Sequence, residues 1–162
     1  MKQEARFALF SLQLDARLAG YKHPDSTEGE VIFPVKVYND DNTEVSDDTE
    51  FGEVVHFCFD TEDASGNVTR KLISYELRKA FSSSQTKTIL RKRTLEITSC
   101  DPNDTTLTQA QKDNWLPLAQ YFDFFGIRLR SKHIDYELRM KTPDGNISVS
   151  YTHLTLPTIL LV

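Results

Sequence analysis

The stretch EVVHFCFDTEDASGNVTRKLI, residues 53–73, decides the fold that the sequence predicts. Its first half places Val55, Phe57 and Phe59 at every second position, which is the period of a half-buried β-strand. The sequence Asp-Ala-Ser-Gly-Asn that follows has the composition of a turn, and residues 68–73 can return as the second strand. The stretch therefore predicts an antiparallel β-hairpin.

The residues after this hairpin fit two different structures. Ser74 can cap a short second helix over about residues 75–81, because apolar side chains follow it at helical spacing. Ile73, Tyr75 and Leu77 also alternate with polar residues, so the strand can equally continue. Both structures are compatible with the sequence.

Further strands are expected on both sides of the hairpin. Residues 5–18 alternate between apolar and polar side chains, which predicts a long, half-buried strand. Residues 31–38 alternate as well and contain Pro34, whose missing amide donor restricts a strand to a sheet edge or a bulge. Residues 88–98 and 127–140 complete the set of expected strands, the first of them basic in its middle.

The main helix is expected over about residues 108–125. Thr108 is a good N-cap and Gln111 completes a capping box. Apolar residues then recur at helical spacing, namely Trp115, Leu118, Ala119, Phe122 and Phe125. Gly126 is a natural stop, and Pro117 should kink the helix or begin its second half.

These elements predict an α+β fold made of a mostly antiparallel β-sheet. About six strands and one or two helices occur in runs, which argues for a sheet with a helix packed on one face. The same order argues against a doubly wound nucleotide-binding fold, in which strands and helices alternate. Residues 1–148 have the length of one domain.

The last fourteen residues, 149–162, resemble translated adapter DNA. Residues 149–158 match one translation of the transposase adapter used to build sequencing libraries, with the codons GTC TCT TAT ACA CAT CTG ACG CTG CCG ACG. We therefore expect residues 149–162 to be non-native and residues 1–148 to begin a truncated reading frame. We also expect little burial of residues 151–162 and a bacterial or phage-borne source, because fragmentary environmental assemblies commonly carry such adapters.

The composition is that of a globular protein. Hydrophobic residues make up 39% and aromatic residues 10% of the chain, which excludes disorder. No apolar run approaches the roughly 20 residues of a membrane span, and no apolar segment follows the N-terminal charges. Two cysteines, Cys58 and Cys100, are too few for a disulfide framework. We therefore expect a cytoplasmic protein that does not bind a membrane.

Charge is distributed unevenly along the chain. The formal net charge is −5, yet residues 25–63 carry thirteen acidic side chains and one basic side chain, Lys36. Residues 64–100 carry two acidic and eight basic side chains. Such blocks can mark partner surfaces. They can also neutralise each other inside one fold, and we favour this second interpretation.

The sequence predicts neither a metal site nor a catalytic site. One acidic loop matches an EF-hand at its first positions, but Val45 stands where glycine is needed and Phe51 where glutamate is needed. His56, Cys58 and Asp60 share one strand face but extend too far to surround one zinc ion. We expect no cofactor, and an enzyme would need an unrecognised cleft that joins these residues to distant carboxylates.

A basic stretch is the strongest binding candidate in the sequence. Its members are Arg70, Lys71, Lys87, Arg91, Lys92 and Arg93. A sheet that carries Arg and Lys beside aromatic residues can follow a phosphate backbone, which makes single-stranded nucleic-acid binding an alternative hypothesis. The isoelectric point of about 5.4 is low for such a protein. We therefore favour a non-catalytic interaction or assembly module that associates with a protein partner or with itself, through strand edges and charged faces.

Overall fold

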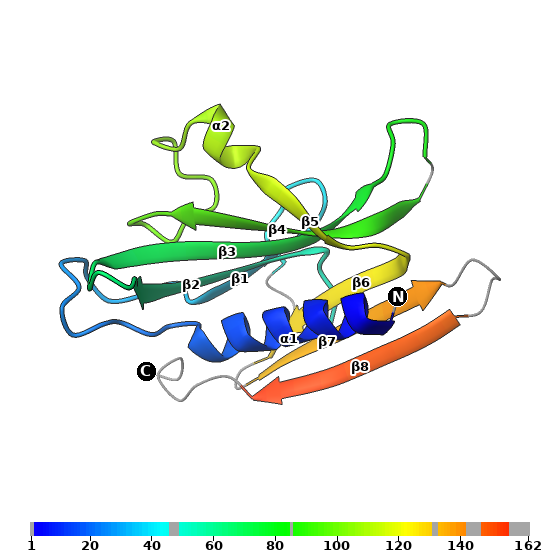
Figure 1. Ribbon diagram of the computed structural model, residues 1–162, viewed down its shortest axis with the longest axis horizontal. Helices are drawn as coiled ribbons and strands as arrows, with labels where there is room; N and C mark the ends of the chain where they lie inside the picture. The colour runs from blue at the N-terminus through cyan, green and yellow to red at the C-terminus, as the bar shows by residue number, and fades with distance from the viewer. Residues whose placement is uncertain (1, 46–48, 85, 131–132, 142–146, 156–162) are drawn as a thin grey trace.

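The computed structural model of the chain describes residues 2–45, 49–84, 86–130, 133–141 and 147–155 (Figure 1). It is an antiparallel α+β fold, as the sequence predicts. Its elements in chain order are α1 (Lys2–Leu18), β1 (Val35–Tyr38), β2 (Val54–Glu62), β3 (Val68–Lys79), β4 (Lys87–Glu96), α2 (Gln109–Lys112), β5 (Trp115–Ala119), β6 (Phe122–Leu129), β7 (His133–Lys141) and β8 (Ile147–Thr155).

Two antiparallel sheets form the framework of the fold. One sheet has five strands in the order β1-β2-β3-β4-β5, and the other has three in the order β6-β7-β8. The predicted hairpin is confirmed as β2 and β3, in which Val55 pairs with Tyr75. Its turn is closed by the Asp63 carboxylate, which accepts hydrogen bonds from the backbone N–H groups of Ser65 and Asn67 at 2.8 and 2.9 Å.

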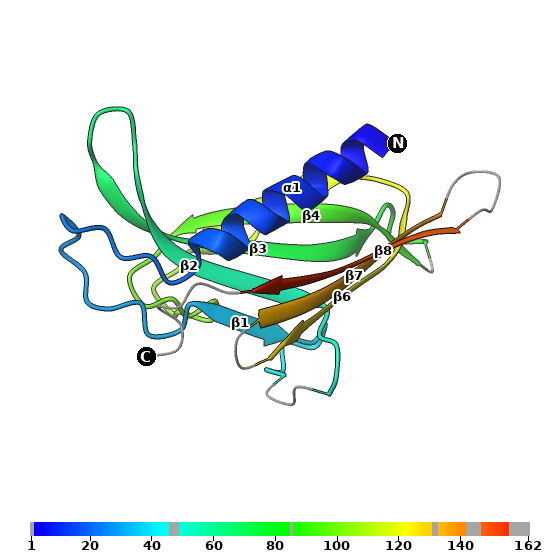
Figure 2. The same ribbon diagram turned by 90° about the horizontal axis from the view of Figure 1, so that it is seen from below.

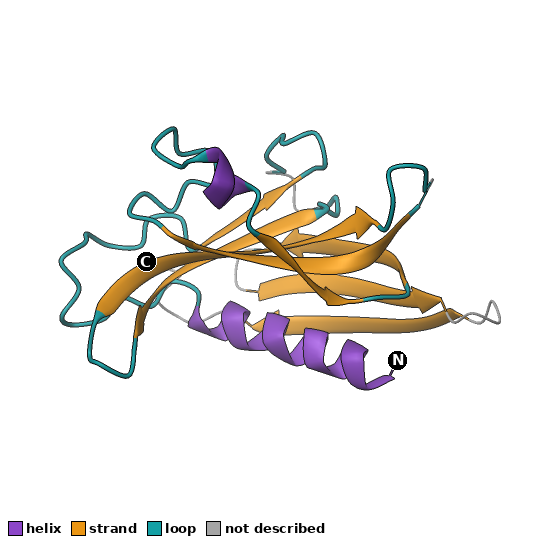
Figure 3. Cartoon of the chain, turned by 45° about the horizontal axis from the view of Figure 1, so that its top comes forward, coloured by secondary structure: helices purple, strands orange, loops and turns teal. Residues whose placement is uncertain are grey.

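Helix α1 and the three-stranded sheet lie on the same side of the five-stranded sheet (Figures 1 and 3). The two sheets are linked at Gly52, whose N–H donates to the Ile127 carbonyl at 2.7 Å and whose carbonyl accepts from the Ile127 N–H at 3.0 Å. A Cβ atom at position 52 would lie 2.2 Å from Val37 Cγ1, so this close approach requires glycine. The main core fills the space between the sheets and α1, and its largest buried side chains include Leu12, Phe57, Tyr75, Leu90, Phe122, Ile127 and Tyr136.

Residues 2–18 form a helix, so the strand predicted over residues 5–18 is wrong. The buried apolar side chains of this segment and of the residue after it recur at helical spacing and are Ala5, Ala8, Leu12, Ala16 and Ala19. The segment also alternates in hydrophobicity because a second set of apolar side chains lies on the opposite, exposed face of the helix. Alanine, leucine, glutamine and arginine are strong helix formers, which favours the helix over the strand.

The main helix predicted over residues 108–125 is wrong beyond its first turn. The capping box is present, because Thr108 Oγ1 accepts a hydrogen bond from the Gln111 N–H at 3.2 Å and the Gln111 side chain accepts one from the Thr108 N–H at 2.8 Å. Helix α2 nevertheless ends at Lys112, and the chain continues as β5 and β6. Pro117 explains this break, because proline disrupts a helix interior but is tolerated in an edge strand such as β5.

The short helix considered over residues 75–81 is also replaced by a strand. β3 continues to Lys79, and Tyr75 pairs with Lys92 of β4. Tyr75 is fully buried in the main core, and a helix at this position could not supply the backbone hydrogen bonds that β4 requires. The alternative that the strand continues is therefore confirmed.

The edge strand expected over residues 31–38 is confirmed only in its second half, as β1, while residues 31–34 are not part of a strand. β1 is the first strand of the five-stranded sheet and begins directly after Pro34. The Pro34 carbonyl accepts a hydrogen bond from the Cys58 N–H at 2.9 Å, so Pro34 contacts the sheet through its acceptor although it has no N–H donor.

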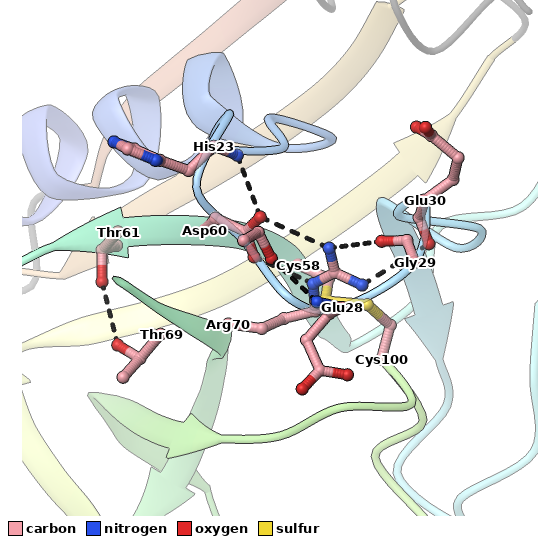
Figure 4. Close-up of polar contacts among 11 residues, drawn as sticks. His23, Glu28, Gly29, Glu30, Cys58, Asp60, Thr61, Thr69, Arg70 and Cys100 are labelled. Atoms are coloured by element: carbon pink, nitrogen blue, oxygen red, sulfur yellow. Dashed lines mark hydrogen bonds and ion pairs between the residues drawn. A yellow bond between two sulfur atoms is a disulfide. The ribbon is translucent and has the colours of Figure 1, made fainter. Parts of the chain in front are cut away.

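A second, smaller core lies on the other face of the five-stranded sheet. Its buried members are Cys58, Leu72, Leu95, Ile97, Cys100 and Leu107. Cys58 and Cys100 are joined by a disulfide (Figure 4), which the sequence analysis did not predict. The bond fastens the segment between β4 and β5 to this face of the sheet.

The three-stranded sheet is completed by β8, which includes residues of the segment expected to be non-native. This strand pairs with β7 along its length, from His133 opposite Thr155 to Lys141 opposite Ile147. The low burial expected for residues 151–162 concerns side chains outside the described part of the structure. Within the described residues, no helix combines the length and the apolar character that a membrane crossing needs.

Candidate functional site

The outer face of the five-stranded sheet, which points away from α1, carries most of the polar residues that the sequence analysis selected. One row of cross-strand neighbours runs from β1 to β5 through Lys36, His56, Ser74, Arg93 and Trp115. The next row runs through Tyr38, Val54, Glu76, Arg91 and Pro117. The pairing of β4 with β5 therefore brings two arginines next to a tryptophan.

Arg91 and Arg93 both lie against the Trp115 ring, each with its guanidinium carbon 4.6 Å from the ring centroid. Cation–π contacts of this kind contribute about 0.5–2 kcal/mol, depending on burial. Arg91 also forms an ion pair with Glu76, and its Nε donates to Glu76 Oε1 at 2.6 Å. The first arginine is therefore neutralised locally by a carboxylate.

The charge of Arg93 is less well compensated. Arg93 is 7% exposed, and within the described residues its one hydrogen bond runs from Nη1 to the Lys112 carbonyl at 3.0 Å. Its Nε is buried and has no partner in that part of the structure. Burial lowers the pKa of the guanidinium, while the more distant carboxylates of Glu76 and Asp113 act in the opposite direction.

His56 lies beside Arg93 as a buried, neutral imidazole. Its Nδ1 is 2.6 Å from Ser74 Oγ, and its ring packs edge-on against Tyr38 with 5.3 Å between the ring centroids. Burial, followed by repulsion from Arg93 and Lys36, lowers the pKa of His56 to about 3. His56 is therefore uncharged at neutral pH.

These residues line a cavity of about 370 Å³, which we call the outer-face cavity. Its wall is completed by the loop after β1, the segment before α2 and the end of α2, through Asn39, Asp40, Asn42, Pro102, Asn103 and Lys112. Asp40, Asn42 and Asn103 are exposed, so the cavity opens to the surface between them. The volume falls in the range of about 300–1,000 Å³ typical of small-molecule sites.

Arg70, a member of the predicted basic stretch, is buried and does not line this cavity. Its Nε donates to Asp60 Oδ1 at 2.9 Å and its Nη2 donates to the Gly29 carbonyl at 2.6 Å. Burial raises the pKa of Asp60, but hydrogen bonds from Arg70 and the His23 N–H, together with the Arg70 charge, lower it overall. Arg70 thus fixes the loop between α1 and β1 and is not among the residues that line the outer-face cavity.

The lysines of the basic stretch also separate in the structure. Lys92 faces the inner side of the sheet, where its Nζ lies 3.0 Å from Asp15 of α1. Lys71 occupies the same inner side as Lys92, by strand alternation. Lys87 lies near the cavity and is paired with Asp40 at 2.5 Å. Of the six predicted cations, Arg91 and Arg93 are therefore the two that line the outer-face cavity.

The predicted trio of His56, Cys58 and Asp60 shares one strand face, as alternation requires. Cys58 is joined to Cys100, and Asp60 is paired with Arg70. Two of the three side chains are therefore committed to structural bonds, and the trio does not form a metal or nucleophile site.

Helix α1 presents a second candidate surface that the sequence analysis missed. Four large apolar side chains form one stripe along its outer face, which we call the α1 stripe: Phe7, Phe10, Leu14 and Leu18. Figure 2 shows α1 on the outside of the fold, across the five-stranded sheet and beside the three-stranded sheet. Helical spacing could have revealed this stripe, but the same residues also fit the alternation of a strand.

Comparisons with known protein families, with curated proteins and with solved structures find no match. The chemistry of the α1 stripe and of the outer-face cavity is thus the basis on which a function can be assigned.

Proposed function

We propose that the protein is a non-catalytic assembly module whose α1 stripe pairs with the α1 stripe of a second copy. The exposure of the stripe carries this proposal, because Phe7 and Phe10 are 61% and 63% exposed and Leu14 is 47% exposed. Burying one large apolar side chain stabilises a protein or a complex by about 1.5–3 kcal/mol. A partner surface that covers the stripe would bury these side chains. Contiguous exposed apolar patches are typical of protein interaction sites.

Leu116 of β5 extends this apolar surface beyond the helix. It is 65% exposed and lies opposite Lys92 in the pairing of β4 with β5. The Lys92 ammonium contacts Ser11 and Asp15 of α1, both at 3.0 Å. The patch therefore includes the helix and the neighbouring sheet edge, which gives a partner a broader surface than one helix face.

The charges beside the α1 stripe favour a second copy as the partner. The 3.6-residue turn of a helix puts Glu4 on one flank of the stripe and puts Arg6 and Arg17 on the other, and all three are exposed. Two parallel helices related by a twofold axis bring opposite flanks together. Glu4 of each copy then faces the arginine-bearing flank of the other, which is the self-complementarity that a twofold interface needs.

Size-exclusion chromatography with light scattering tests this proposal. We expect the wild-type protein to form a dimer and Phe10→Glu to raise the dissociation constant at least about 100-fold, because a carboxylate would be buried in an apolar interface. Phe81→Glu is the matched control, because it introduces the same charge at a residue that is 73% exposed and lies after β3. A wild-type protein that stays monomeric at millimolar concentration, or equal effects of the two variants, would contradict the proposal.

Binding of single-stranded nucleic acid is the second candidate function. It is favoured by the placement of Arg91 and Arg93 beside Trp115, because cations next to an aromatic ring can hold a phosphate and stack a base. It has less support than self-association, because Arg70 and Lys92 are paired with carboxylates on other parts of the sheet.

A cytoplasmic location also stays a prediction. It was inferred from the low cysteine count together with the lack of an apolar segment after the N-terminal charges, and the bond between Cys58 and Cys100 weighs against it. Glutathione and thioredoxin keep most cytosolic thiols reduced, so a persistent disulfide is more common in oxidising compartments.

A further inference from the structure

We propose that the outer-face cavity binds a small polar molecule that carries one phosphate or carboxylate group, with Arg93 as the anchor for that group. This binding site is separate from the α1 stripe, which lies on the other side of the five-stranded sheet, and it does not require a second copy of the chain.

The charges that line the cavity leave Arg93 without a counter-ion. Both lining carboxylates are already paired, Asp40 with Lys87 at 2.5 Å and Glu76 with Arg91. Arg93 forms no ion pair within the described residues, although it is 7% exposed. A buried charge without a partner is costly, and an anion in the cavity would remove that cost.

The geometry of the Arg93 side chain is suited to an oxyanion. Nη1 is held by the Lys112 carbonyl at 3.0 Å and the guanidinium rests on the Trp115 ring, so its orientation is fixed before a ligand arrives. Among the described residues, Nη2 donates no hydrogen bond, which leaves a donor for an oxygen in the cavity. A fixed planar guanidinium is a strong binder of carboxylate and phosphate groups.

The rest of the lining favours a polar ligand body. Lys112 also lines the cavity and is a second basic residue without an ion pair in the described part of the chain. Asn42 and Asn103 lie at the mouth and are hydrogen-bonded to each other, from Nδ2 to Oδ1 at 2.9 Å. Their remaining amide groups can bind hydroxyl or carbonyl groups of a ligand.

The surroundings of the mouth favour a single anionic group over a polynucleotide. Asp40, Asp41 and Glu44 are exposed on the loop after β1, which forms one wall of the cavity. These carboxylates would repel a long phosphate backbone that extends out of the cavity, whereas a small ligand anchored on Arg93 stays inside it.

Trp115 is the single tryptophan of the sequence, so its fluorescence reports on this cavity directly. The full chain would be titrated with inorganic phosphate and, separately, with acetate, at constant ionic strength. We expect a saturable change with at least one of them, and the stronger of the two identifies the anionic group. Arg93→Gln should weaken that binding at least about tenfold, because it removes a charged hydrogen bond.

Two further variants keep this test decisive. Arg78→Gln removes an exposed cation from β3 outside the cavity and should leave the affinity unchanged. Lys112→Gln keeps the backbone carbonyl that accepts the hydrogen bond from Arg93, and it should weaken anion binding by a smaller factor than Arg93→Gln. This second variant still tests the proposal if Arg93→Gln does not fold. Equal affinity in all variants, or no response to either anion, would overturn the proposal. A response to a single-stranded oligothymidine alone would overturn it in favour of nucleic-acid binding.

Discussion

His56 is a residue whose surroundings make folding stability depend on pH. Its pKa is lowered from 6.5 to about 3 in the folded chain, first by burial and then by Arg93 and Lys36. Between these two values the unfolded chain binds a proton that the folded chain does not bind. The free energy of unfolding should therefore fall as the pH falls below 6.5, by up to about 1.4 kcal/mol per pH unit.

Replacing His56 by glutamine tests this dependence, because glutamine can still hydrogen-bond to Ser74 but does not titrate. We expect urea unfolding at pH 7 and pH 5 to show a smaller loss of stability in His56→Gln than in the wild-type protein. The other three histidines are common to both proteins, so their contributions cancel in the comparison. An identical loss in both proteins would mean that His56 is protonated in the folded state.

The candidate site could be predicted from the sequence only in part. The alternation of side chains along a strand is enough to place Arg91 and Arg93 on one face of β4 and Lys92 on the opposite face. The predicted binding site should therefore not have included Lys92. Trp115 could not be assigned to the same site, because its position beside the arginines depends on the pairing of β4 with β5. Residues that meet across strands far apart in sequence leave no local pattern.

The elements show why α1 and the region after residue 108 were assigned to the wrong type. In α1 the apolar residues fit both the two-residue period of a strand and the period of a helix. The strand prediction treated Phe10 and Leu14 as buried, whereas both are exposed in the structure. After α2 the apolar residues keep helical spacing by coincidence, and Pro117 was the contrary evidence. The hairpin of β2 and β3 was predictable because the composition of its turn and the alternation in its strands indicate the same structure.

The segment between β4 and β5 depends on one covalent bond and on a small core. We expect the double variant Cys58→Ser/Cys100→Ser to lose about 2–4 kcal/mol of unfolding free energy in urea, because the bond closes a long loop in the unfolded chain. The two cysteines are 42 residues apart, which is long enough for this loop-closure effect. Dithiothreitol should destabilise the wild-type protein to a similar extent and leave the double variant unchanged; equal stability of the oxidised and reduced wild type would contradict this.

Across the whole molecule, the acidic and basic blocks of the sequence meet inside one sheet. Asp40 pairs with Lys87, and Asp60 pairs with Arg70, so residues from the acidic block neutralise residues from the basic block. This favours the interpretation that the blocks compensate each other within the fold. The charged faces expected to drive association are thereby weakened, and the uncharged α1 stripe becomes the better surface for assembly.

The arrangement of the two copies can be tested with single cysteines in the α1 stripe. In a parallel pair with a twofold axis along the helices, each residue faces its own counterpart. Phe7→Cys and Leu14→Cys should therefore both give disulfide-linked dimers under mild oxidation, which intact mass spectrometry detects. In an antiparallel pair, a residue faces its counterpart in the other copy only if it lies near the twofold axis. Positions 7 and 14 lie about 10 Å apart along the helix, so they cannot both lie near that axis. Cross-linking at one position alone would thus indicate an antiparallel pair, in which Arg6 and Arg17 of the two copies would repel each other. Cross-linking at neither position, with Phe81→Cys as the exposed control, would place the partner surface away from α1.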